Sequence, residues 1–85
     1  MINDKILKYT QDKYPNEHAL IGRSLINYYT LKIKEDKSEF EAMHQEKIYD
    51  GVMELFEILS KKIADEIDED SDVIYESLMS IHIKT

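Results

Sequence analysis

The chain has 85 residues, no cysteine and a formal net charge of −7 at pH 7. A chain this short forms one small domain, residues 1–85, and without cysteine it has no disulfide, no thiolate catalysis and no cysteine-ligated zinc. The acidic balance disfavours nucleic acid as a general partner, because binding phosphates needs clustered cations.

Two glycines and one proline among 85 residues indicate helices joined by short turns. We expect a first helix from Asn3, a good N-cap, to about Tyr14. Pro15 disfavours the helical conformation of the residue before it and ends that helix. Asn16 is then expected to cap the next helix.

A second helix is expected over residues 17–34, and it is apolar on two sides. The second side carries Ile26, Tyr29 and Ile33 at helical spacing. Such a helix is either central in its bundle or covered on one side by another subunit. We therefore take these three residues as candidate interface residues and a homo-oligomer as one way to cover them. The alternative for residues 28–34, which are rich in β-formers, is a strand.

The longest element is an amphipathic helix expected over residues 38–67. Ser38 and Glu41 form the capping-box pattern at its start. Its expected core flank consists of Phe40, Met43, Ile48, Val52, Leu55, Phe56, Leu59, Ile63 and Ile67. Gly51 falls at the edge of this flank, where a bare backbone would let a neighbour pack closely. The acidic stretch 68–72 is expected to break the chain before a last helix.

Charge is distributed unevenly along the chain. Residues 1–37 carry seven Lys/Arg and five Asp/Glu, whereas residues 38–85 carry four and thirteen. The two halves can pack against each other with opposite charges along their edges, or the acidic half can bind a partner with a basic surface. Glu46, Asp50 and Glu54 repeat at four-residue spacing and repel one another, and only Glu57 has a well-placed cation, Lys61. An acidic helix face meant for a basic partner would exploit this repulsion through salt-sensitive association.

Metal and catalytic patterns are weak in this sequence. Asp68, Asp70 and Asp72 match positions of a calcium loop, but Val73 and Met79 stand where its glycine and glutamate belong. Glu41 and His44 have the one-turn spacing used in metal-carboxylate bundles, and a homodimer could supply a second copy. No phosphate-binding loop, nucleophile motif or cofactor fingerprint is present, so we expect neither catalysis nor a cofactor.

These patterns predict an all-α fold, a small three- or four-helix bundle built around the helix at 38–67. The expected function is that of a non-enzymatic, acidic, protein-binding regulator or inhibitor of bacterial or phage type. The candidate partner-binding residues are Glu46, Asp50, Glu54, Glu57, Ile26, Tyr29 and Ile33. The alternatives are a small DNA-binding regulator using the basic N-terminal half and a dimeric metal-carboxylate bundle. The charged N-terminus, unlike a secretory signal, leads us to expect a cytoplasmic protein that makes no use of a membrane.

Overall fold

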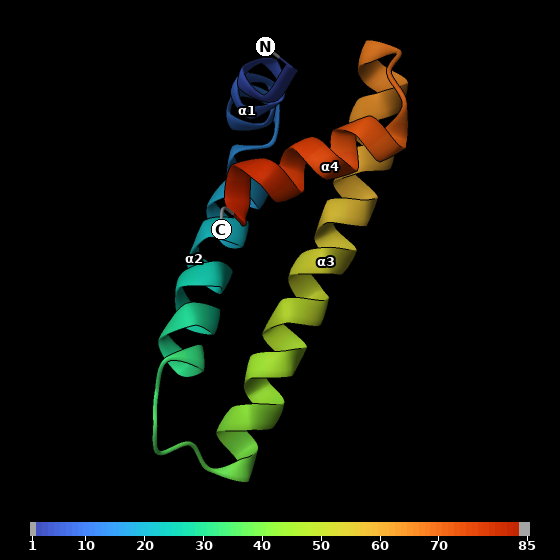
Figure 1. Ribbon diagram of the computed structural model, residues 1–85. Coiled ribbons are helices and arrows are strands. Elements are labelled where there is room, and N and C mark those ends of the chain that lie inside the picture. Colours follow the sequence, from blue (N-terminus) through green and yellow to red (C-terminus); the bar gives the residue numbers. More distant parts are fainter. Residues whose placement is uncertain (1, 84–85) are drawn as a thin grey trace.

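A computed structural model describes residues 2–83 and contains four helices within that range (Figure 1). They are α1 (Ile2–Lys13), α2 (Pro15–Lys32), α3 (Glu39–Ile67) and α4 (Ser71–His82). No strand occurs among residues 2–83, which confirms the all-α bundle around one long helix. The strand alternative for residues 28–34 is wrong, because α2 continues to Lys32. Within residues 2–83, no helix is long and apolar enough to cross a membrane.

The ends of α3 are set by local hydrogen bonds that the sequence pattern anticipates. The Glu41 backbone N–H donates to Ser38 Oγ at 3.2 Å, and the Ser38 N–H donates to the Glu41 carboxylate at 3.1 Å. At the other end Asp68 adopts a left-handed conformation (φ 57°, ψ 51°), which stops the helix. Asp70 then caps α4, accepting from the Asp72 N–H at 2.8 Å.

The caps expected for the first two helices are wrong in detail. Asn3 lies inside α1, which includes Ile2, and its side chain donates to Ser80 of α4 at 3.2 Å. Tyr14 occupies the cap position of α2, with Pro15 as the first helical residue, so Asn16 is already helical. Proline is favoured at this first position because the backbone N–H that it lacks would be unpaired there.

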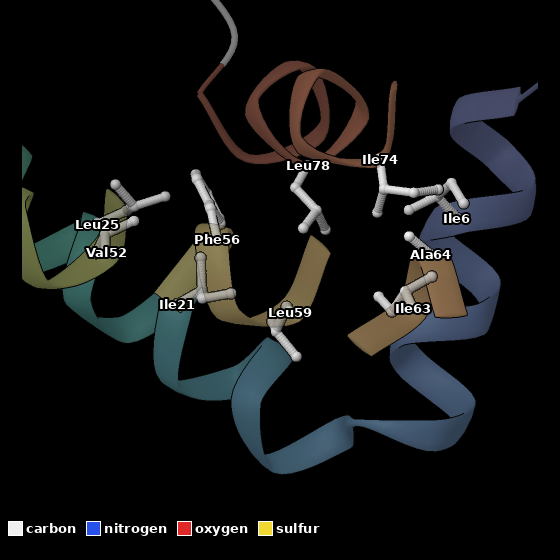
Figure 2. Packing of buried hydrophobic residues seen from close by; sticks show 10 residues of the cluster. All are labelled: Ile6, Ile21, Leu25, Val52, Phe56, Leu59, Ile63, Ala64, Ile74 and Leu78. Atoms are coloured by element: carbon white, nitrogen blue, oxygen red, sulfur yellow. The ribbon is translucent and has the colours of Figure 1, made fainter. Parts of the chain in front are cut away.

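The hydrophobic core lies where all four helices meet. Figure 2 shows Ile74 and Leu78 of α4 pointing down onto side chains of α2 and α3, with Ile6 of α1 beside Ile74. The core consists of Ile6, Ile21, Leu25, Val52, Phe56, Leu59, Ile63, Ala64, Ile74 and Leu78. We call this part of the molecule the head.

A polar contact also holds α1 and the start of α2 to the end of α3. The Glu66 carboxylate accepts from Tyr9 Oη at 2.8 Å and from Tyr14 Oη at 2.8 and 2.9 Å. Lys13 Nζ lies 3.0 Å from the same carboxylate. The pKa of Glu66 is therefore below its usual value, mainly through Lys13 and then through Tyr14 and Tyr9. This cluster joins the basic half of the chain to the acidic half.

Two predictions for the apolar flank of α3 are wrong. Phe40 and Met43 are 82% and 54% exposed, because α1 and α4 do not extend to the first turns of α3. Gly51 is not a close-packing site, since a Cβ added there would have no neighbour within 4 Å. The opposite, charged flank of α3 is exposed as expected.

His82, the last residue of α4, forms an imidazole pair with His18 of α2. The rings of His18 and His82 are 5.0 Å apart, and His82 stacks on Phe56 with ring centroids 5.6 Å apart. His18 Nδ1 and His82 Nε2 are buried without a hydrogen-bond partner. Burial, and secondarily the neighbouring His18, lower the pKa of His82 to about 4.

Replacing Gly51 with alanine should stabilise the protein. Glycine in a helix interior costs about 0.5–1 kcal/mol relative to alanine, and the added methyl group meets open space. We expect Gly51→Ala to raise the free energy of unfolding by about that amount in urea titrations. Gly22→Ala in α2, where the same space is open, should give a similar gain. A loss of stability in Gly51→Ala would show that the backbone at this position is closely packed after all.

Acid should destabilise the head through His82. The pKa of this imidazole is about 4 in the folded chain and 6.5 when unperturbed, so the unfolded state binds more protons between these values. The contribution of neutral His82 to the free energy of unfolding is therefore fully present above pH 6.5 and is lost as the pH drops toward 4. Because the ring is only half-buried, solvent screening limits the loss to about 1–2 kcal/mol.

Urea titrations across this pH range would measure that loss. His82→Phe keeps an aromatic ring against Phe56 and should flatten this part of the pH dependence. His44→Gln, at an exposed position of α3, is the matched control and should leave the profile unchanged. An identical slope in His82→Phe and in the wild type would rule out His82 as its source.

Candidate interaction surface on the helical arm

The half of the α2–α3 hairpin farthest from the head is not covered by other helices. In Figure 1, α4 crosses the upper part of the hairpin, and neither α1 nor α4 reaches the lower part. No residue in the stretch 26–51 is buried. We call this stretch, which includes the end of α2, the connecting turn and the first turns of α3, the arm.

The arm nevertheless carries several large apolar side chains. Ile26 and Tyr29 of α2, and Ile33 at its C-cap, are 67%, 37% and 79% exposed. Phe40 and Met43 are exposed at the start of α3. The stripe at 26, 29 and 33 is therefore exposed and not central in the bundle. The other alternative, that another subunit covers it, stays a prediction.

Three tyrosine rings form a row across the arm. Tyr29 contacts Tyr28 edge-on with ring centroids 5.2 Å apart, and Tyr28 lies 5.3 Å from Tyr49 of α3. Lys32 Nζ lies 5.9 Å from the ring centroids of both Tyr28 and Tyr29. This row connects the apolar stripe on α2 with the charged side of α3.

Beside the row is a cavity of about 380 Å³. It is lined by Tyr28, Gln45, Glu46, Tyr49 and Asp50. Residues 46, 49 and 50 lie three and four positions apart, so the helical repeat places them on one side of α3. Two of the predicted partner-binding carboxylates thus share one hollow with two aromatic rings.

The three carboxylates at four-residue spacing, Glu46, Asp50 and Glu54, have different surroundings. All three carboxylates are exposed, but only Glu46 and Asp50 line the cavity and Glu54 does not. Among residues 2–83, no cation lies within ion-pair distance of these three carboxylates. Glu57 pairs with Lys61 at 3.2 Å, the pair foreseen from the sequence.

Two lysines near the tip of the arm hold the turn. Lys34 forms an ion pair with Glu41, and Lys37 Nζ donates to Gln45 Oε1 at 2.9 Å. The pKa of Glu41 is lowered, first by Lys34 and then by the Ser38 backbone N–H. Glu41 therefore serves the cap and the turn, and residues 2–83 contain no cluster of three or more potential metal ligands.

The cavity-lining residues that the sequence analysis did not single out are Tyr49 and Gln45. They join Glu46 and Asp50 only through the pairing of α3 with α2, which brings Tyr28 to the same hollow. No motif or spacing along the chain encodes that pairing. Comparisons with protein-family models, curated proteins and solved structures give no match to this chain.

The arm should open more readily than the head. Local unfolding costs least where few apolar contacts are buried, and residues 26–51 bury none of their side chains. In native-state hydrogen exchange we expect the helical amides of the arm to exchange at least about tenfold faster than those near Phe56 and Ile63. Uniform protection along α3 would contradict a separate arm.

Proposed function

We propose that this protein is a non-enzymatic interaction module whose arm docks on a partner protein with a basic surface. The observation that carries the proposal is the complete lack of buried side chains over residues 26–51, in a segment that exposes five large apolar residues. A paired-helix arm without a core is marginally stable in water, since most helical stability comes from packing an apolar face. Docking would supply that packing.

The chemistry of the arm favours a basic partner. Glu46 and Asp50 repel each other by about 0.2–0.5 kcal/mol at this spacing, and a cation from outside would relieve that repulsion. Two of the four lysines in the arm already have side-chain partners, Lys34 with Glu41 and Lys37 with Gln45. A protein of this kind acts by occupying a surface of its partner, as a regulator or inhibitor does.

The apolar stripe provides the test of docking. Tagged protein would be used to retain partners from an extract of its own cells, in about 0.05 M salt and in about 0.5 M salt. The double variant Ile26→Gln/Ile33→Gln replaces two exposed apolar side chains with polar residues that are good helix formers. We expect a specific partner to be retained by the wild type and lost with the double variant.

Ile58→Gln is the matched control, because Ile58 is a 47% exposed isoleucine outside the arm. It should retain the partner as the wild type does. Retention should also weaken in the higher salt, since rim charges act mainly through screened attraction. Equal retention by the wild type and the double variant would refute docking through the arm.

A further inference from the structure

The cavity beside the tyrosine row combines two features that recognise organic cations. Tyr28 and Tyr49, 5.3 Å apart, supply aromatic rings, whose faces attract a cation. Glu46 and Asp50 supply carboxylates at the same hollow, and no cation of residues 2–83 pairs with either of them. A ligand that lies flat on a ring and donates hydrogen bonds from its edge would satisfy both features.

The tyrosine row already attracts a cation within this chain. Lys32 Nζ lies 5.9 Å from the centroids of Tyr28 and Tyr29, within the range of a cation–π contact. Lys32 does not line the cavity, and neither does any other lysine or arginine. The side of the row toward Tyr49 is therefore open to a cation from another molecule.

Arginine fits this hollow better than lysine does. A guanidinium group is planar, stacks on aromatic rings and donates N–H groups from its edge to carboxylates in a bidentate manner. An ammonium group is a strongly hydrated point charge that gains less from a ring face. The volume of about 380 Å³ is at the small end of ligand sites, suited to one side chain rather than to a larger ligand.

We propose that the cavity lined by Tyr28, Glu46, Tyr49 and Asp50 receives an arginine side chain of the partner protein. The guanidinium stacks on the Tyr49 ring and donates to the carboxylates of Glu46 and Asp50. This inference rests on the proposed docking function, for which it names the anchoring contact. The apolar stripe and the cavity would then act together, one through burial and the other through charge.

The test uses N-acetyl-arginine N-methylamide as the probe, titrated into the isotopically labelled full chain and followed by NMR. We expect the signals of Tyr28, Glu46, Tyr49 and Asp50 to shift together and to saturate, with a dissociation constant of about 1–10 mM. The citrulline analogue has the same shape but no charge and should bind at least about fivefold more weakly. The lysine analogue should also bind more weakly than arginine.

Variants distinguish arginine binding in the cavity from nonspecific attraction to the acidic surface. Glu46→Gln/Asp50→Asn keeps the shapes of both side chains and should weaken arginine binding at least about fivefold. Glu54→Gln removes an equal charge one turn farther along α3, outside the cavity, and should bind as the wild type does. Lys32→Met removes the competing cation and should tighten binding about twofold.

Several results would overturn the inference. These are shifts spread over the exposed carboxylates of residues 68–72, equal binding of citrulline or lysine, and unchanged binding in Glu46→Gln/Asp50→Asn. If arginine does not bind while Ile26→Gln/Ile33→Gln still abolishes partner retention, the proposed arginine site is refuted and the proposed docking through the arm is kept. If arginine binds in the cavity while retention is indifferent to the stripe, the docking proposal fails instead.

Discussion

Unequal helix lengths determine the shape of this molecule. α1 and α4 have 12 residues each, whereas α2 has 18 and α3 has 29. At 1.5 Å per residue the two short helices are about 18 Å long and α3 is about 43 Å long. Two short helices can cover only part of a long hairpin, so the core gathers at one end. The remaining length becomes the arm, and the molecule extends to 45 Å along its longest axis.

The covered end is held by more than apolar packing. Glu66 gathers Tyr9, Tyr14 and Lys13 at the junction of α1 and α2. The left-handed residue Asp68 ends α3, and the cap at Asp70 starts α4, so the chain reverses within a few residues. This reversal returns α4 onto the head, where it crosses the hairpin and ends at His82 before it reaches the arm (Figure 1).

Features of single helices were predictable where interactions between residues close in sequence determine them. The capping box at Ser38 and Glu41, the break after Ile67 and the pair of Glu57 with Lys61 all follow from spacing alone and are confirmed. The cap proposed at Asn16 is wrong, because Pro15 is favoured as a first helical residue and moves the start of α2 to the proline itself. The cap proposed at Asn3 is wrong, because α1 already includes Ile2.

Tertiary features were harder to foresee. Phe40 and Met43 continue the apolar pattern of α3, yet they are exposed because no helix extends far enough to cover them. Periodicity tells which side of a helix is apolar but not how far its neighbours reach. The cavity is a similar case, since Tyr28 and Tyr49 meet only through the alignment of α2 with α3. The sequence indicated Glu46 and Asp50 as surface residues, while their grouping with Tyr28 and Tyr49 around a hollow required the structure.

The negative charge of the chain is concentrated away from the tip of the arm. Residues 54–76 contain two lysines and nine carboxylates, a net charge of −7 that equals the total for the chain. The head thus provides a negative field that draws basic molecules from a distance, and such fields raise association rates more than final affinity. Final contact would depend on the arm.

The absence of buried residues in the arm also bears on how such a protein can change over time. Surface substitutions away from caps and networks usually alter stability by less than about 0.5 kcal/mol. Most positions over residues 26–51 are of this kind, whereas Phe56, Ile63, Ile74 and Leu78 are fully or almost fully enclosed. The arm can therefore accumulate substitutions while the head keeps the chain folded. If the arm docks as proposed, its recognition surface can be redesigned with little effect on the stability of the head.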